Sequence, residues 1–289
     1  VVTDHHLAPA QLPEAAAVVD PQQPGDESGC GMLAGAGVAF KLVCALEGCD
    51  AEELLPVYGD LAAIGTVADI MPLVGENRRM VKAGLALLQE TDRPGLAALI
   101  RQCGLEGKRL TAENISFALA PRLNAAGRMD DATAALELLL CEDEAQAAGL
   151  AAALEEKNAE RQKTEQHIAQ SVLDTLAADP SYETDRILVV WGEGYHQGVI
   201  GIVASRMGEK FGKPAIVTDT HCIRLCNRIG LVKNITEPKK VEMALWKIIP
   251  PEEGSDLCHR FVLHGRAVCD ARKPDCAACC LKTFCCGHT

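Results

Sequence analysis

The chain changes in character near residue 218, and this change limits what it can fold into. Residues 219–289 hold 11 Lys or Arg against 8 Asp or Glu, a net charge of +3, so the total of −12 leaves −15 on residues 1–218. Nine of the 14 cysteines lie in the last 68 residues. Such clustering is typical of a metal or cluster site in a cytosolic protein. With 289 residues, the chain is expected to form two domains, or three small ones.

The first 218 residues have the pattern of a helix-rich α/β protein. Ala and Leu dominate, and only 3% of all residues are aromatic. Residues 1–6 predict a buried strand that ends in polar side chains, and residues 33–46 predict a helix. Residues 131–178 contain no Pro and one Gly, so they predict long connecting helices. Residues 186–218 predict a strand, a glycine-rich turn, a helix and a second strand.

Composition also excludes some classes of protein. No apolar run approaches the length of a membrane span and no signal peptide opens the chain, so a cytoplasmic location without membrane contact is expected. The net charge of −12 argues against a protein that holds nucleic acid by bulk attraction.

Four polar residues are candidates for a catalytic metal centre. Asp4, His5 and His6 stand at the end of an apolar run, and Asp69 lies in the largely apolar segment 54–73, where burying an unpartnered carboxylate would be costly. Two-metal phosphoesterases use carboxylate and imidazole ligands to hold Mn²⁺ or Mg²⁺. The alternative is a surface pair of histidines and an aspartate that caps a helix.

Two further blocks have the composition of phosphate contacts. Residues 122–128 place two arginines around small residues, which lets a backbone approach a ligand closely. Residues 194–201 place glycines before a helix, a spacing that suits a nest of backbone amides for an anion. The alternatives are a helix cap with solvated arginines and an ordinary glycine turn.

The cysteine-rich end predicts one compact metal centre. Four cysteines are separated by six, two and five residues, namely Cys269, Cys276, Cys279 and Cys285. This spacing suits either a [4Fe–4S] cluster or a structural zinc ion, and spacing alone does not choose between them. Disulfides are the weaker alternative for a cytosolic chain. No role is assigned to Cys280 or Cys286.

Residues 1–218 resemble the RecJ-type DHH phosphoesterases, which are 5′→3′ exonucleases specific for single-stranded DNA. The resemblance rests on five blocks in the order and approximate spacing of that family: TDHH, LAGAGVAFKL, GTVADIMPLVGENR, PRLNAAGRMDD and GYHQGVIGIVASR. It implies that His5 and Asp69 bind Mn²⁺ or Mg²⁺, that His6 faces the scissile phosphate, and that Asp4 orients the imidazoles. It also implies a set of substrate-side residues: Arg122, Asn124, Arg128, His196, Gly198 and Arg206.

The chain departs from this family at its start. RecJ-type enzymes supply further carboxylates from an upstream block of the DxDxDG kind and from another upstream Asp, and these precede the first residue here. We therefore expect a metal centre with part of its ligands, and weak or absent activity.

Residues 219–289 resemble the C-terminal part of endonuclease III, the iron–sulfur DNA glycosylase and AP lyase. The blocks are DTHCIRLCNRIGLV, LHGRAVCDARKPDC and the four-cysteine spacing. The resemblance implies a [4Fe–4S] cluster on the four cysteines, a catalytic role for Asp219, and DNA phosphate contacts from Arg272 and Lys273. In that family the helix–hairpin–helix and the nucleophilic Lys lie upstream of these blocks, where this sequence is RecJ-like, so lyase chemistry is not expected.

The sequence thus predicts an α/β architecture in four parts. These are a partial DHH domain over residues 1–130, a helical connector over 131–180, a partial DHHA1 lobe over 181–218, and a small α-helical iron–sulfur tail over 219–289. The predicted function is a metal-dependent 5′→3′ exonuclease that acts on single-stranded DNA. The alternatives are a non-catalytic DNA-binding fragment held by the tail, and a DNA glycosylase.

Overall fold

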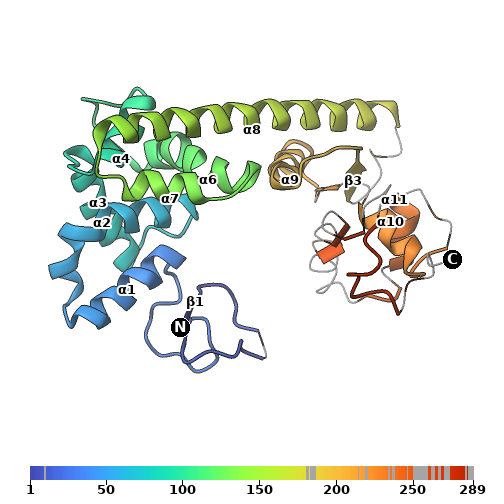
Figure 1. Ribbon diagram of the computed structural model, residues 1–289, viewed down its shortest axis with the longest axis horizontal. Coiled ribbons are helices and arrows are strands. Elements are labelled where there is room, and N and C mark those ends of the chain that lie inside the picture. Colours follow the sequence, from blue (N-terminus) through green and yellow to red (C-terminus); the bar gives the residue numbers. More distant parts are fainter. Residues whose placement is uncertain are drawn as a thin grey trace. The chain divides into compact units, whose positions relative to one another are not determined.

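The chain folds into two compact units, Val1–Ala159 and Glu160–Thr289. The computed structural model (Figure 1) describes residues 1–9, 11–179, 182, 187–213, 215–218, 221–233, 235, 238–245, 247–249, 260–261, 264–265, 268–269, 274–283 and 285. Among the described helices, none is both long and apolar enough to cross a membrane.

The first unit is helical apart from one short pair of strands. Strands β1 (Val2–Thr3) and β2 (Val18–Val19) pair in parallel, with Val2 opposite Val18. The helices that follow are α1 (Gly35–Glu47), α2 (Ala51–Ala68), α3 (Gly75–Gln89), α4 (Pro94–Gln102), α5 (Ala112–Asn114), the π-helical turn η1 (Ile115–Leu119), α6 (Ala120–Met129), α7 (Thr133–Leu140) and the start of α8 (Glu144–Ala178). The predicted helix over residues 33–46 is confirmed as α1, and of the long helices predicted over residues 131–178, α8 is long with 35 residues whereas α7 has only 8.

The opening strand differs from its prediction. It is two residues long rather than a full buried strand, and Val1 is 75% exposed. Its one described partner is β2, so apolar side chains at the start of the chain have little against which to pack. An apolar run becomes a buried strand only when other elements cover it.

Small residues allow the helices of the first unit to pack closely. A Cβ on Gly84 in α3 would lie 2.2 Å from the carbonyl oxygen of Gly59 in α2, and a Cβ on Gly65 would lie 2.3 Å from the Cβ of Ala36 in α1. Helix α2 therefore lies against both α1 and α3 with its backbone close to theirs. The core beneath α2, α4, η1 and α8 is formed by large side chains that are fully buried, including Leu88, Leu96, Leu99, Ile115, Leu119, Leu138 and Leu154.

The second unit contains the predicted strand–helix–strand segment. Strand β3 (Leu188–Trp191) pairs in parallel with β4 (Ala215–Thr218), and α9 (Gln197–Phe211) connects them. Parallel strands require a crossover connection, which α9 provides. This confirms the secondary structure predicted for residues 186–218.

The part of the chain that follows β4 forms a core of its own. Helices α10 (His221–Arg228) and α11 (Pro238–Leu245) bury a separate apolar cluster that consists of Leu225, Cys226, Val232, Val241, Leu245 and Phe261. Within the described residues of this unit, the sheet has no strand after β4. The change in charge and cysteine content near residue 218 thus coincides with the end of the sheet.

Gly95 is a position where one methyl group should destabilise the first unit. A Cβ there would lie 1.8 Å from the carbonyl oxygen of Leu138, whereas a Cβ on Gly149, inside α8, would have nothing within 4 Å. We expect Gly95→Ala to lower the free energy of unfolding by about 3 kcal/mol, because α4 must move away from α7. Gly149→Ala should raise it by about 0.5–1 kcal/mol, because Ala favours the helix. Urea unfolding monitored by circular dichroism measures both changes, and equal effects at the two positions would contradict the packing described.

Candidate metal centre

The candidate metal centre forms where the end of β1 meets the end of α2. The Nε2 atom of His5 lies 3.4 Å from Oδ2 of Asp69, although 64 positions separate the two residues in the sequence. The His5 ring lies against Gly35, the first residue of α1, where a Cβ would be 3.4 Å from the ring. The side chain of His5 is 15% exposed and that of Asp69 is 44% exposed. An imidazole fixed by packing thus faces a carboxylate that solvent can reach.

Asp4 organises the two histidines that follow it. Its Oδ1 accepts hydrogen bonds from the backbone N–H of His5 (2.7 Å) and His6 (3.2 Å), and it lies 2.8 Å from Nδ1 of His6. The His6 side chain, followed by the two backbone donors, lowers the pKa of Asp4 to about 2. Asp4 in turn raises the pKa of His6. Asp4 is therefore ionised at neutral pH and holds the turn and the His6 ring in place.

These donors fit a divalent cation. One ligand atom from each of Asp4, His5 and His6 can be chosen so that all three lie within 4.8 Å of one another. Asp69 adds a carboxylate next to His5. Carboxylate oxygens suit Mg²⁺ and Mn²⁺, and imidazole nitrogens suit the transition metals.

A hollow of about 290 Å³ opens beside His5 and Asp69. Asn124 of α6 also lines it, and small residues form the remaining wall: Ala34, Gly35, Ala36, Gly65 and Ala68. The absence of large side chains on this wall leaves room for a ligand next to the metal donors. Of the substrate-side residues that the sequence predicted in the first unit, Asn124 is the one that lines this hollow.

A strained turn fixes Asp69 at the end of α2. Asp69 is the C-cap residue, so the helix-capping position considered from the sequence is the one it occupies. The next residue, Ile70, has a φ of 56°, in the left-handed region that β-branched residues avoid. The N–H of Ile70 bonds to the carbonyl of Val67 and that of Met71 to Thr66, which is the Schellman pattern of helix ends. Backbone strain of this kind is common at functional sites.

Asn77 braces the two loops beside the centre, and the sequence reasoning missed it. Its Nδ2 donates to the carbonyl oxygens of Met32 (2.7 Å) and Pro72 (3.1 Å), and the residue is 2% exposed. Met32 precedes α1, which carries Gly35, and Pro72 follows Asp69. The sequence signal for Asn77 was weak: one amide residue at the end of the GTVADIMPLVGENR block.

The two arginines of the 122–128 block lie in different surroundings. Arg122 forms an ion pair through Nε with Glu155 of α8 and donates from Nη1 to the carbonyl of Ala118 (2.8 Å). Its side chain is 17% exposed, and the ion pair joins α6 to α8. Arg128 is exposed near the end of α6. Neither arginine lines the hollow beside His5.

The glycine-rich block of the second unit caps α9. His196 is the N-cap residue, and its Nδ1 accepts a hydrogen bond from the N–H of Gly198 (3.2 Å). Farther along α9, Arg206 forms an ion pair with the buried carboxylate of Glu165, which also pairs with Arg161 at 2.7 Å. His196 and Gly198 thus lie together at the start of the helix, whereas Arg206 lies more than two turns beyond them.

Sulfur atoms of the tail lie among polar groups. Arg228 of α10 donates from NH1 to Sγ of Cys269 (3.0 Å), and Sγ of Cys285 donates to the carbonyl of Arg228 (3.4 Å). The Sγ of Cys279 lies 3.3 Å from Nε2 of His264. Asp219, Arg272 and Lys273 lie outside the described residues.

The spacing of these sulfur atoms bears on the kind of centre they fit. Four thiolates on one zinc ion lie roughly 3.8 Å apart, since each Zn–S bond is about 2.3 Å. Among the described cysteines, no three sulfur atoms lie within 4.8 Å of one another. A [4Fe–4S] cluster accepts a wider arrangement, because each thiolate binds a different iron. The assignment of a cluster is accordingly a proposal that rests on the resemblance to endonuclease III.

Comparison with known proteins finds relatives of two kinds. The DHH family N-terminal domain matches residues 1–66, and the HhH-GPD superfamily of base excision DNA repair proteins matches residues 78–251. The single-stranded-DNA-specific exonuclease RecJ of Bacillus subtilis is 43% identical over 217 residues, which are 75% of this chain and 27% of that protein. Endonuclease III of Rickettsia conorii is 47% identical over 75 residues, which are 26% of this chain and 35% of that protein.

The solved structures include a RecJ. The crystal structure of RecJ from Thermus thermophilus in complex with Mn²⁺ superposes with a TM-score of 0.66 at 30% identity, and the match covers 91% of this chain and 41% of that one. The chain belongs to the HhH-GPD superfamily, and its first 66 residues match the DHH family N-terminal domain. Its larger part is RecJ-like and the rest is endonuclease III-like, as the sequence blocks predicted.

Two features of these matches concern the predicted boundary at residue 219 and the share of each relative that the chain covers. The HhH-GPD match begins at residue 78, well before residue 219, where the sequence predicted the endonuclease III-like part to start. It therefore overlaps helices and strands of the RecJ-like part. The chain also spans 27% of the Bacillus RecJ and 41% of the Thermus structure, a minor share of each.

Relieving the strain at Ile70 should stabilise the first unit. Ile70 is 86% exposed, so its replacement removes little buried surface. We expect Ile70→Asn to raise the free energy of unfolding by about 1 kcal/mol, because Asn tolerates the left-handed conformation. Gly48→Ala is the converse control, since Gly48 ends α1 with a φ of 68° and open space around it. Gly48→Ala should lower the free energy of unfolding by about 1 kcal/mol. Denaturant unfolding measures both variants, and a destabilised Ile70→Asn would contradict the strain assigned to Ile70.

Proposed function

We propose that this chain acts as a metal-dependent nuclease on single-stranded DNA, with the 5′→3′ exonuclease chemistry of the RecJ type. The observation that carries the proposal is the contact between His5 and Asp69. The contact brings two distant blocks together at an open hollow that His5 and Asp69 line. Asp4 and His6 lie close to His5, and this set of groups with metal-ligand chemistry suits hydrolysis of a phosphodiester better than a structural role.

The roles of the residues follow from their positions. His5 and Asp69 bind Mn²⁺ or Mg²⁺, and Asp4 orients the histidines through the hydrogen bonds described above. His6 is 76% exposed and its Nδ1 is held by Asp4, so its Nε2 is available to a phosphate oxygen. When bound, the metal stabilises negative charge on the phosphoryl group.

The substrate side begins at Asn124, which reaches the same hollow from α6. Arg128 offers a guanidinium to a phosphate of the strand, and Arg122 supports α6 through its pair with Glu155. In the second unit, His196 and Gly198 present the start of α9 to an anion, and Arg206 lies farther along that helix. The proposed domains are residues 1–130, 131–180, 181–218 and 219–289. A cytoplasmic location suits a nuclease whose relatives act on DNA.

The tail supports a second candidate function, which is DNA binding without catalysis. We propose that Cys269, Cys276, Cys279 and Cys285 hold a [4Fe–4S] cluster and that Arg272 and Lys273 contact DNA phosphate. The positive charge of residues 219–289 favours this candidate. Glycosylase or lyase activity through Asp219 is the third candidate, and trapping of a Schiff base on abasic DNA with borohydride tests it.

The nuclease proposal is tested with Mn²⁺ and a 5′-phosphorylated single-stranded oligonucleotide. We expect at most weak release of mononucleotides, in keeping with the partial set of ligands expected from the sequence, and loss of this release when a chelator removes the metal. His5→Ala removes a proposed ligand, so it should weaken Mn²⁺ binding, measured by calorimetry, by more than the roughly 10–100-fold that loss of an outer-shell partner costs, and abolish release. His167→Ala, an exposed histidine on α8, is the control and should change neither quantity. Unchanged Mn²⁺ affinity in His5→Ala would reject the proposed centre.

The tail is tested by optical spectroscopy and DNA binding. We expect the purified chain to show the iron–sulfur charge-transfer absorption, and Cys276→Ser to lose it. Under the second candidate, binding to single-stranded DNA should survive removal of Mn²⁺ and weaken with Arg272→Glu. Arg101→Glu makes the same change in net charge at an exposed position of α4 in the first unit, so an equal loss of binding in that variant would show a non-specific charge effect.

A further inference from the structure

A second hollow lies in the first unit, apart from the candidate metal centre. Its volume is about 500 Å³, and it lies between α3 and the segment around residues 109–112. Val81 and Leu110 form its buried floor, at 4% and 6% exposure, and Leu85 and Leu73 extend the apolar surface. None of its lining residues belongs to the hollow beside His5.

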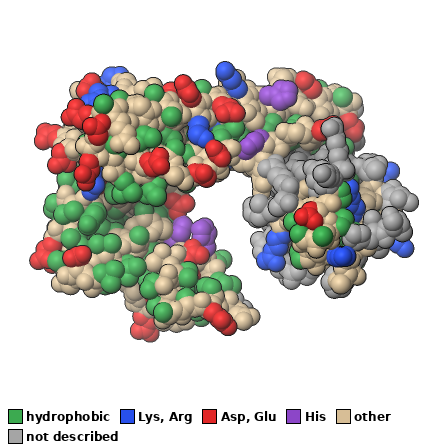
Figure 2. Space-filling view, in the orientation of Figure 1, with side chains coloured by type: hydrophobic (Ala, Val, Ile, Leu, Met, Phe, Trp, Pro, Cys, Tyr) green, Lys and Arg blue, Asp and Glu red, His purple; other side chains and the backbone are tan. Residues whose placement is uncertain are grey.

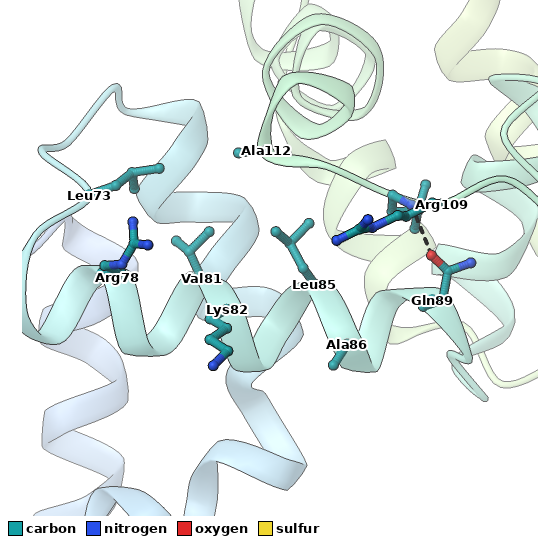
Figure 3. A pocket seen from close by; sticks show the side chains of 10 residues that line it. Leu73, Arg78, Val81, Lys82, Leu85, Ala86, Gln89, Arg109 and Ala112 are labelled. Carbon is teal, nitrogen blue, oxygen red and sulfur yellow. Dashed lines mark hydrogen bonds between the residues drawn. The ribbon is translucent and has the colours of Figure 1, made fainter.

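Three cationic side chains surround this apolar floor. Arg78 and Lys82 stand one turn apart on α3, and Arg109 reaches over Leu85 from the facing segment (Figure 3). All three are exposed, and no ion pair to any of them is formed within the described part of the chain. By contrast, the adjacent Arg79 pairs with Glu52 at 3.1 Å.

These three cations lie in a unit that is otherwise strongly acidic. Residues 1–159 contain 24 Asp or Glu and 11 Lys or Arg, a net charge of −13, and Figure 2 shows acidic side chains spread over the helices of this unit. No acidic residue lines the hollow. A local concentration of positive charge beside apolar surface therefore favours a ligand that is both acidic and apolar.

The shape of the surface indicates what kind of ligand fits. The lining follows α3 from Arg78 to Gln89, which is roughly 17 Å or about three turns of helix. Apolar residues at positions 81 and 85 and cations at 78 and 82 repeat with the period of a helix. A partner helix laid along α3 can match both rows at once.

We propose that this groove binds an acidic amphipathic helix of about three turns from a partner protein. Its apolar side chains enter between Val81, Leu85 and Leu110, and its carboxylates pair with Arg78, Lys82 and Arg109. Single-stranded nucleic acid is the other anionic macromolecule that three cations attract. Surfaces for single strands stack bases on aromatic rings, and no aromatic residue lines this groove.

The test uses the full chain and a fluorescein-labelled designed peptide of 14 residues. Leu occupies positions i, i+3, i+4 and i+7 of the peptide, and Glu flanks them. A second peptide carries Lys in place of each Glu. We expect saturable binding of the Glu peptide by fluorescence anisotropy and none of the Lys peptide. Hydrogen exchange should show protection of residues 78–89 and 109–112 when the Glu peptide is bound.

Charge-reversal variants test whether the Glu peptide binds in this groove. The double variant Arg78→Glu, Lys82→Glu should weaken binding of the Glu peptide by roughly tenfold or more and allow the Lys peptide to bind. The double variant Arg101→Glu, Lys163→Glu has the same net charge with both changes outside the groove, and it should bind as the unaltered chain does. Arg109→Glu provides an independent change on the facing segment, with the same expected direction.

Three results would overturn the proposal. The first is no binding of the Glu peptide by the unaltered, folded chain. The second is an equal loss of binding in the two double variants. The third is displacement of the Glu peptide by labelled oligo-dT with protection of the same residues, which would assign the groove to nucleic acid. None of these results depends on nuclease activity.

Discussion

The close approach of α1 and α2 is the constraint on which the candidate metal centre depends. A Cβ on Gly65 would lie 2.3 Å from the Cβ of Ala36, so a larger residue at either position would separate the helices. The start of α1 carries Gly35, which supports the His5 ring, and the end of α2 carries Asp69. Small residues that have no chemistry of their own thus bring the support of His5 and the helix end that carries Asp69 close together.

Local patterns in the sequence predicted most of the helices, whereas the opening strand is shorter than predicted. The periodicity of residues 33–46 and the Pro-free segment 131–178 predicted helices because helix formation depends on nearby residues. The pairing of His5 with Asp69 came from the family resemblance. Two features depended on distant partners and could not be read locally: the poor burial of Val1 and the use of Arg122 as a brace to Glu155. The role of Asn77 could not be read locally either, because its two hydrogen-bond partners, Met32 and Pro72, lie 45 and 5 positions away.

The boundary between the RecJ-like part and the endonuclease III-like part coincides with a change in packing along the chain. The parallel pair of β3 and β4 ends at Thr218, and the helices that follow bury their own apolar cluster around Leu225 and Cys226. The polar contacts of Arg228 with Cys269 and Cys285 also lie within this last part. The apolar cluster of this last part is built from its own residues, and α11 also contacts β3. The HhH-GPD match that begins at residue 78 shows that helical segments of the RecJ-like part also satisfy that superfamily's pattern.

The brace formed by Asn77 has a consequence for how the molecule fluctuates. A single amide group holds the carbonyls of Met32 and Pro72, so neither loop can leave its position without breaking a bond to the same nitrogen. The segments before α1 and after α2 should then open together as one cooperative unit, rather than fraying separately. Access to the wall that carries His5 and Asp69 would be governed by this shared opening.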